Sequence, residues 1–567
     1  MLWERGERIL SAVPCRRDHP TSRTVLTTTA SAQSELAAPS ELRSSTVLAF
    51  LCGTVLVASL VLGGGTRSGF LSDAILQLVA TPLLVTALWR LTSSGAFLRL
   101  RGALAFCTAF VLVPILQLVP LPPALWTALP GREAVAEAYA LLGRELPWHP
   151  ISVAPHATWL GLVSLVVPLG IFLATLQLER RARRALSLAV LGIGVVSVFL
   201  GLLQVAQGPS SPLRFFAFTN PTEAVGFFAN RNHFAALLYS MMLLAAAWTV
   251  HIGNRITAAG AQRHDTPLIL ALCAGLAVTV TLVAAQMMAR SRAGLALAIV
   301  ALLGIWALAV RDRKSGARSA TGRLIAGAVG LALVLGVQFA LYRVLARFDA
   351  DPLADARITF ARTTIEAAKA HMPFGSGVGT FVPVYKTFES IQDARTSYAN
   401  RAHNDVLEVW LEAGAPALIL MAVFVIWLVR RNLALWRAEP PTGGEIDLLL
   451  ARAAGLVLTL VSAHSLVDYP LRTAAMMALF AFAAALLFDP PDEPKPRHSP
   501  RLVPDKKRSA RASNSNRAKM LNRTLQNRPV TNDWADMQWP EAWRTEAKRG
   551  APDWPKQDAA RDPYDAD

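Results

Sequence analysis

Runs of apolar residues, each about as long as a bilayer is thick, recur along most of this chain and limit the folds open to it. Lipid cannot satisfy an unpaired backbone N–H or C=O group, so a helix that crosses the bilayer core needs roughly 20 apolar residues. About twelve such runs can be counted, at 46–63, 70–89, 103–119, 158–177, 185–206, 233–251, 267–288, 293–310, 324–345, 415–430, 446–465 and 470–488. We therefore predict an all-α polytopic membrane protein.

The composition agrees with a membrane protein and argues against nucleic acid as a partner. Hydrophobic residues make up 53% of the chain and charged residues only 17%, and the mean hydropathy is +0.38. The net charge of +17 is spread over the loops between apolar runs, where basic residues report membrane orientation. Three of the four cysteines lie inside apolar runs, which excludes a disulfide framework.

Basic residues are divided unevenly between alternate loops, and this division predicts the orientation. The loops of one set are rich in arginine: Arg90, Arg99, Arg101, Arg180, Arg181, Arg183, Arg184, Arg255, Arg263, Arg311, Arg313, Lys314, Arg318, Arg323, Arg430, Arg431 and Arg437. Short loops of the other set hold fewer: Arg67, Arg132, Arg144, Arg214, Arg231, Arg290, Arg292 and Arg472. The positive-inside rule places the first set, and with it both termini, in the cytoplasm.

The same reading divides the chain into three regions. Residues 1–45 are predicted to be a cytoplasmic arm, 46–488 a transmembrane catalytic domain, and 489–567 a disordered cytoplasmic tail, because the tail lacks apolar clusters. The outward loops 120–157 and 346–414 are long. Within the second, ARITFARTTIEAAKAHM predicts an amphipathic helix, and the GSGVGTF segment that follows predicts a turn.

Soluble-enzyme motifs are missing from this sequence. It contains no P-loop, HExxH or CxxC motif in a convincing context, no zinc-spaced Cys/His cluster and no DxD-type acidic pair. Polar residues gather instead at the outward ends of the apolar runs: Asn230, Arg231, Asn232 and His233; Arg290 and Arg292; Arg357 and Arg362; and Arg401, His403, Asn404 and Asp405.

Several arginines with a histidine on one side suit an anionic diphosphate next to a proton acceptor. Cations at a membrane interface are costly to desolvate, at roughly 2.5–3.5 kcal/mol each at mid-bilayer, and they are often retained for a ligand. Arg132 and Arg144 stand outside these clusters. We interpret both as interfacial side chains.

These polar segments resemble the O-antigen ligase and O-antigen polymerase family of bacterial membrane glycosyltransferases. The likeness runs from about Leu48 to Phe488, and the segments follow the family's order: FFANRNHFAALL, the SRAG of Ser291–Gly294, RITFARTTIEAAKAHMPFGSGVGTF, AHNDVLEVWLEAG and HSLVDYPLR. Ala361, Val406 and Ala417 depart from residues that are frequent in the family. These departures concern the lipopolysaccharide ligases more than the family as a whole.

The resemblance implies a C-type glycosyltransferase fold with about 12 transmembrane helices, in the bacterial inner membrane, that needs neither metal nor cofactor. It would transfer a glycan from an undecaprenyl-diphosphate carrier to an acceptor hydroxyl at the periplasmic face. Arg292 and Arg357 would bind the diphosphate, and His403 would orient or deprotonate the acceptor hydroxyl, or hold the diphosphate. Weaker candidates for substrate binding are Arg290, Arg231, Asn404 and His233.

The acceptor is left open by the sequence. It is the growing glycan in a polymerase, the lipid A core in a ligase, and a Ser/Thr hydroxyl in a protein O-oligosaccharyltransferase; without an added periplasmic domain, we favour the first two. A different class, a small-solute membrane transporter, also has many spans. Against it, the polar groups cluster at the outer interface, and the two halves show no obvious inverted repeat.

Overall fold

The computed structural model describes residues 45–67, 69–93, 96–259, 265–311, 352–392, 398–440 and 443–490, with the single positions 327 and 330. Ten helical spans among them are long and apolar enough to cross a membrane. They are Ser45–Leu62, α2 (Leu71–Ser93), α3 (Ala96–Gln117), α6 with α7 (Pro155–Ser164 and Val166–Gln177), α8 (Arg180–Gln207), α9 (Arg231–Ala259), α10 (Thr266–Ala289), α11 (Arg292–Arg311), α15 (Asp405–Arg437) and α16 (Glu445–His464).

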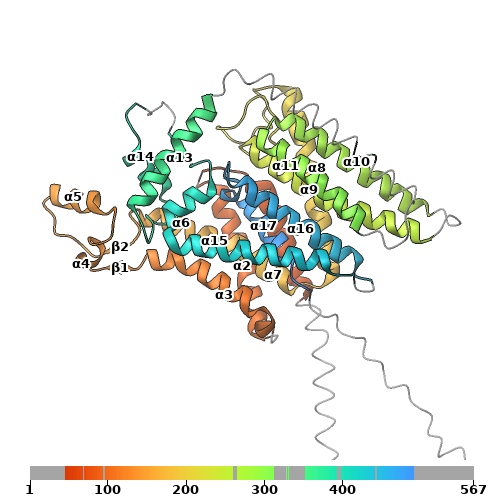
Figure 1. Ribbon diagram of the computed structural model, residues 1–567, viewed down its shortest axis with the longest axis horizontal. Coiled ribbons are helices and arrows are strands. Elements are labelled where there is room, and N and C mark those ends of the chain that lie inside the picture. The colour runs from red at the N-terminus through yellow and green to blue at the C-terminus, as the bar shows by residue number, and fades with distance from the viewer. Residues whose placement is uncertain are drawn as a thin grey trace, which may run out of the picture. The chain divides into compact units, whose positions relative to one another are not determined.

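Shorter helices and strands lie in the connections between these long helices (Figure 1). An antiparallel pairing of β1 (Pro120–Leu121) with β2 (His149–Pro150) closes the excursion that holds α4 (Pro123–Trp126) and α5 (Glu133–Leu141). The remaining elements are α13 (Pro352–Ala370), α14 (Phe381–Phe388), the 3₁₀ helix η1 (Pro470–Arg472) and α17 (Ala474–Leu486). The predicted all-α polytopic fold and the amphipathic helix before GSGVGTF, which is α13, are confirmed.

Ten of the predicted apolar runs coincide with these spans. The run at 470–488 differs, because it folds as η1 followed by α17, whose 13 residues reach only about 20 Å. Span 415–430 is extended, since α15 already begins at Asp405. Apart from positions 327 and 330, the run at 324–345 lies outside the described residues, as do the arm before Ser45 and the tail after Pro490.

Helix α9 lies at the core of the bundle and packs against α8, α10, α11 and α16. Small residues such as Ala235, Ala236 and Ala247 are fully buried on it, and small side chains let neighbouring helices approach closely in a membrane. The first turn of α9 therefore has a fixed position at one end of the bundle. That end also holds the start of α15 and the end of α16, because Asp405 N–H donates to Ser465 O at 2.8 Å.

Helix α15 is broken at Gly414, and the turn after α13 packs into the break. Gly414 has φ 60° and ψ −148°. Ala415 N–H donates to Pro373 O at 2.8 Å, and Gly377 N–H donates to Glu412 O at 2.8 Å. The break thus anchors α13, which carries Arg357, to the helix that follows His403.

We expect Gly414→Ala to lower stability by about 2 kcal/mol or more, because this backbone conformation is nearly exclusive to glycine. A Cβ atom there would also lie 2.6 Å from Gly375 N. Gly192→Ala is the matched control, since nothing lies within 4 Å of its added Cβ in α8. The readout is the thermal unfolding midpoint of each variant in detergent. Equal midpoints for the two variants would contradict this account of the break.

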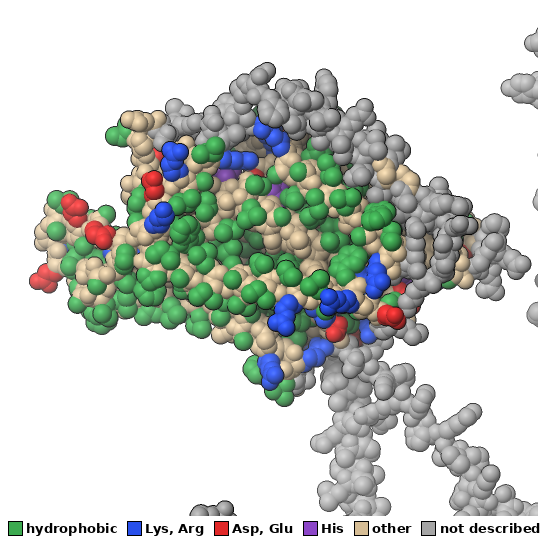
Figure 2. Space-filling model, viewed as in Figure 1, with side chains coloured by type: hydrophobic (Ala, Val, Ile, Leu, Met, Phe, Trp, Pro, Cys, Tyr) green, Lys and Arg blue, Asp and Glu red, His purple; other side chains and the backbone are tan. Residues whose placement is uncertain are grey.

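Basic side chains gather at the end of the bundle away from α13 and α14 (Figure 2). Near the start of α8, Arg184 makes a two-pronged ion pair with Asp447 in the first turn of α16, with both N···O distances at 2.7 Å. Arg183 donates to Phe488 O at 2.7 Å, and Arg431 donates to Leu487 O at 2.6 Å. These arginines satisfy carbonyls at helix ends as well as carrying charge.

The interpretation of Arg132 as an interfacial side chain is wrong. Arg132 is 1% exposed, and its guanidinium donates to Pro130 O, Ile151 O and Gly375 O at 2.5–2.6 Å. Burial lowers its pKa to about 10. Carbonyl oxygens of two distant segments thus compensate the cost of burying it, and Arg132 ties the 120–150 excursion to the turn after α13. Arg144 is exposed, as the interfacial interpretation expects.

Candidate functional site

A buried carboxylate, that of Asp468, forms the centre of the polar end of the bundle. Asp468 lies on the short loop between α16 and η1, and its side chain is 1% exposed. An isolated charge at such a position is costly, so its partners have to be charged or hydrogen-bonding groups. In the space-filling view, histidine and acidic side chains are visible in a recess on this side of the bundle, next to basic side chains (Figure 2).

Three distant segments supply the partners of Asp468. Asn232 at the start of α9 donates its side-chain amide to Oδ2. Arg357 Nη2 on α13 lies 3.6 Å from the same oxygen. His403 Nδ1 lies 3.5 Å from Oδ1, to which Tyr469 N–H also donates at 2.9 Å. Two residues predicted from the sequence, Arg357 and His403, therefore meet at an acid that was not predicted.

Asp468 is held in its ionised form. Burial raises its pKa, but the contact with His403 and the neighbouring imidazoles of His233 and His464 lower it more. The resulting pKa lies well below the ordinary value for an aspartate. A fixed negative charge facing Nδ1 favours the His403 tautomer that carries its proton on Nδ1 and leaves Nε2 as the basic nitrogen.

His403 has a strained backbone and a ring that is packed on two sides. Its φ is 52°, which is unusual for a residue with a side chain. Its ring stacks on Phe360 of α13 at 5.8 Å and meets the Tyr469 ring edge-on at 4.8 Å. Nδ1 is buried and faces Asp468 without a hydrogen bond, while the side chain as a whole is 22% exposed, so the exposed part of the ring lies away from Nδ1.

Tyr469 lies between two of the histidines. Its ring meets His233 edge-on at 4.8 Å, the same separation as from His403. Burial and the Asp468 carboxylate raise its pKa to about 12, against the opposing effect of hydrogen bonds with Asn400 and Asn230. The phenol therefore stays protonated at neutral pH and fixes the spacing between the two imidazoles.

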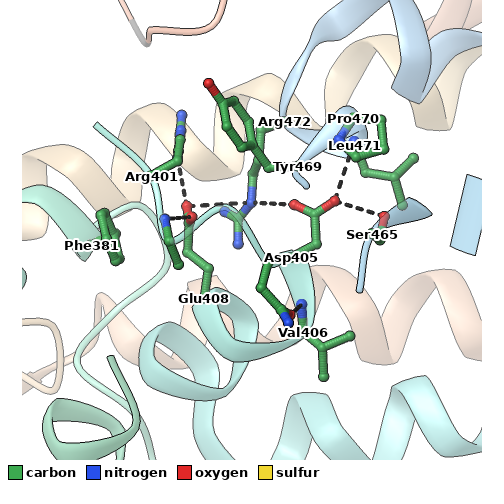
Figure 3. Close-up of polar contacts among 12 residues, drawn as sticks. Phe381, Arg401, Asp405, Val406, Glu408, Ser465, Tyr469, Pro470, Leu471 and Arg472 are labelled. Carbon is green, nitrogen blue, oxygen red and sulfur yellow. Dashed lines mark hydrogen bonds and ion pairs between the residues drawn. The ribbon is translucent and has the colours of Figure 1, made fainter. Parts of the chain in front are cut away.

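A second polar cluster surrounds Arg472 at the end of η1 (Figure 3). Its guanidinium lies 3.3 Å from Asp405 Oδ1, 3.5 Å from Glu408 Oε1 and 2.8 Å from Glu412 Oε2. The three acids share one face of α15, and all are buried. Burial lowers the pKa of Arg472, but the three carboxylates raise it above its ordinary value.

Arg401 joins this cluster to the segment that carries His403. Arg401 Nη1 lies 2.8 Å from Glu408 Oε1, and Ala402 N–H donates to Glu408 Oε2 at 3.0 Å. Asn404 then caps α15, because its side-chain oxygen accepts the N–H groups of Val406 and Leu407 at 3.0 Å. The Arg472 cluster thus fixes the backbone on both sides of His403.

The other predicted residues are distributed around this end of the bundle. Arg292 is exposed at the start of α11, and Gly294 of that turn packs against Ala235 on α9, two residues after His233. Arg290 is exposed in a left-handed conformation with φ 51°. Arg292 and Arg290 therefore lie at the same end as Asp468.

Of the three remaining weaker candidates, Arg231 and Asn404 have polar partners within the protein, and His233 is buried. Arg231 pairs with Glu223 at 2.5 Å; burial raises the pKa of Glu223, but Thr222 and Arg231 lower it more. Asn404 caps α15 and donates to Leu466 O at 2.7 Å. His233 is fully buried, and within the described part of the chain neither ring nitrogen has a hydrogen-bond partner. A substrate contact for these three stays a prediction.

The sequence interpretation missed Asp468, Arg472 and the acids Glu408 and Glu412. One signal was available: Asp405, Glu408 and Glu412 recur at helical spacing before an apolar run, and buried acids on one helix face require a cation elsewhere. Behind Asp468, Tyr239 OH lies 3.1 Å from His464 Nδ1. Among the described residues, no three His, Cys, Asp or Glu side chains are grouped to hold a metal ion, and metal independence stays a prediction.

These features define a polytopic membrane protein with a cation-rich polar site at the ends of its helices. Residues 277–422, which include Arg290, Arg292, Arg357 and His403, match the family model described as O-antigen ligase. The match supports assignment of the chain to the O-antigen ligase and polymerase family. At the coarse level it supports a membrane protein similar to glycosyl-transferring ligases. A search of curated proteins gives no match.

Proposed function

We propose that this protein transfers a glycan from an undecaprenyl-diphosphate carrier to an acceptor hydroxyl at the periplasmic face of the inner membrane. The observation that carries the proposal is the meeting of His403 and Arg357 at the Asp468 carboxylate. It joins a proton acceptor and a phosphate-binding cation at one site. A base held by a carboxylate is the arrangement that activates hydroxyl groups in many unrelated enzymes.

His403 is the base in this proposal. The oxygen of the acceptor hydroxyl attacks the anomeric carbon of the donor sugar and forms the new glycosidic bond, and its proton passes to His403 Nε2. Asp468, facing Nδ1 at 3.5 Å, stabilises the imidazolium that forms. The proton then leaves to the released diphosphate or to water, which restores the neutral imidazole.

Arg357 and Arg292 act on the leaving group. The bond between the anomeric carbon and the diphosphate oxygen breaks, and its electron pair stays on the diphosphate. The side chain of Arg357 is 41% exposed next to Asp468, so it is accessible to a phosphate, and Arg292 is exposed at the same end of the bundle. Fixed guanidinium groups stabilise such developing charge, and arginine matches phosphate in a two-pronged geometry.

The periplasmic orientation is supported by the distribution of charge. Arg180 and Arg184 pair with Asp447 in the first turn of α16, and Arg183 and Arg431 donate to carbonyls just after α17. Asp468 follows the last turn of α16, so these arginines lie at the other end of this helix, and basic residues favour the cytoplasmic side. The Asp468 site then faces the periplasm and both termini face the cytoplasm. The location of the site at helix ends also favours a glycosyltransferase over a transporter, whose substrate site lies near mid-membrane.

Arg357→Ala is expected to slow transfer roughly 10²-fold, which corresponds to about 3 kcal/mol of transition-state stabilisation. Arg144→Ala is the matched control, because Arg144 is exposed in the 120–150 excursion. The variants are returned to a strain that lacks the gene, and surface glycans and carrier-linked intermediates are analysed.

The intermediates also identify the acceptor. Single repeat units that accumulate on the carrier indicate a polymerase, long chains on the carrier indicate a ligase, and loss of glycan from protein indicates a protein O-oligosaccharyltransferase. Unchanged glycans in the deletion strain would contradict the proposed function.

A further inference from the structure

We propose that a platform next to His403, made of Arg67, Phe218, Lys386 and Tyr398, binds an anionic sugar of the acceptor glycan, one that carries a carboxylate or a phosphate. The proposal rests on the proposed function, because it assigns the acceptor side of the same reaction. It concerns residues that play no part in the chemistry described above.

Two cations of the platform lie against aromatic rings. The guanidinium carbon of Arg67 lies 3.9 Å from the centroid of the Phe218 ring and 5.4 Å from that of Tyr398. Lys386 Nζ lies 5.3 Å from the Tyr398 centroid. The two rings are unusually open to solvent, with Phe218 68% and Tyr398 45% exposed. Three regions distant in the sequence, around Arg67, around Phe218 and near Lys386 and Tyr398, thus meet in one solvent-accessible patch.

The cations of this platform differ from the arginines of the neighbouring site, because those arginines each pair with a carboxylate. Arg357, Arg401 and Arg472 each face a carboxylate. In the part of the chain that the structure describes, no carboxylate forms an ion pair with Arg67 or Lys386. An aromatic face attracts a cation without neutralising it, and a guanidinium stacked on a ring directs its N–H groups outward. Two uncompensated cations beside one ring therefore favour an anionic ligand.

Hydrogen bonds and ring contacts connect segments that carry platform residues to segments around His403. Tyr398 precedes Asn400, which hydrogen-bonds with Tyr469, and the Tyr469 ring packs on His403. On the other side, Ala229 N–H donates to Gly64 O at 3.0 Å, which holds the Arg67 loop against the segment that enters α9. We infer from these links that the platform lies on the same side of the molecule as His403, where another sugar of an acceptor glycan is bound.

We infer that the ligand is a sugar because the platform exposes two aromatic rings, Phe218 and Tyr398, in addition to its two cations. A sugar ring presents an apolar C–H face that stacks on an aromatic ring, while its carboxylate or phosphate reaches the cations. An anionic lipid headgroup satisfies the charges and has no such face for Phe218 and Tyr398. The same chemistry thus has two sources, a glycan or a lipid, and a binding experiment separates them.

The test measures binding to the purified full-length protein in phosphatidylcholine nanodiscs by calorimetry. The probes are an oligosaccharide that ends in glucuronic acid and its counterpart that ends in glucose. We expect the acidic probe to bind about tenfold more tightly, and Arg67→Ala to remove most of this preference. Tyr398→Ala should weaken both probes, Tyr398→Phe should retain binding, and Arg144→Ala, the matched control, should leave Kd unchanged.

Two results would overturn the proposal. One is equal affinity for the acidic and the neutral probe in the wild-type protein. The other is competition by phosphatidylglycerol nanodiscs that is abolished by Arg67→Ala, because the platform would then be a lipid headgroup site. Preferential binding of the acidic probe by a protein that transfers no glycan would support the platform and contradict the proposed function, so the two failures are distinguishable.

Discussion

Asp468→Asn should reduce glycan transfer by about 10³- to 10⁴-fold, the largest loss of activity that we expect from a single substitution outside His403. The carboxylate holds His403 in the tautomer that leaves Nε2 basic and stabilises the imidazolium formed during transfer, and an amide does neither. In other enzymes, replacing the carboxylate behind a catalytic histidine with an amide costs roughly 10⁴-fold in kcat. The measurement is single-turnover transfer by purified protein.

The control for Asp468→Asn is Asp447→Asn at the opposite end of the bundle. It removes the two-pronged ion pair with Arg184 and should leave the transfer rate within about twofold of the wild type. Because Asp468 is buried, both variants are first compared by thermal unfolding. A folded Asp468→Asn protein with wild-type transfer would show that His403 does not depend on this carboxylate.

Arg472→Met should produce the largest loss of stability. The guanidinium faces Asp405, Glu408 and Glu412, whose side chains are at most 8% exposed. Removing the cation leaves buried carboxylates with reduced compensation, and breaking a buried pair in this way costs about 3–5 kcal/mol. We expect a large fall in the unfolding midpoint and in the yield of folded protein.

A second substitution separates loss of charge balance from loss of packing. Glu412→Gln combined with Arg472→Met removes one carboxylate together with its cation, so the double variant should be more stable than Arg472→Met alone. Arg472→Lys keeps the charge without the planar fork and should be intermediate. If all three variants unfolded at the wild-type temperature, the ion cluster would not be a determinant of stability.

The fold was largely predictable because a bilayer enforces helix length. Ten apolar runs became spans for this reason, whereas at 470–488 the apolar run alone was misleading. Thr473 caps a new helix there by accepting Met476 N–H, and the preceding residues form η1. The early start of α15 was missed because Asp405, Glu408 and Glu412 look unsuitable for a buried helix. Arg472, about sixty residues later, together with Arg401 makes their burial tolerable.

The site was predictable to the extent that its residues were visible as exceptions to an apolar pattern. Arg357 and His403 were identified in this way, but the carboxylate that joins them was not, because Asp468 resembles an ordinary loop acid. Arg132 was misjudged for the converse reason. Its partners are backbone carbonyls, which have no signature in a sequence.

The most direct test of the account compares His403→Ala with the wild type in proteoliposomes supplied with an undecaprenyl-diphosphate-linked glycan and an acceptor glycan. Donor binding and single-turnover transfer are measured separately, since the base acts on the acceptor and not on the diphosphate. The account predicts donor binding close to wild type and transfer reduced at least as much as by Asp468→Asn, by about 10³- to 10⁴-fold. Transfer at the wild-type rate by folded His403→Ala protein would contradict it.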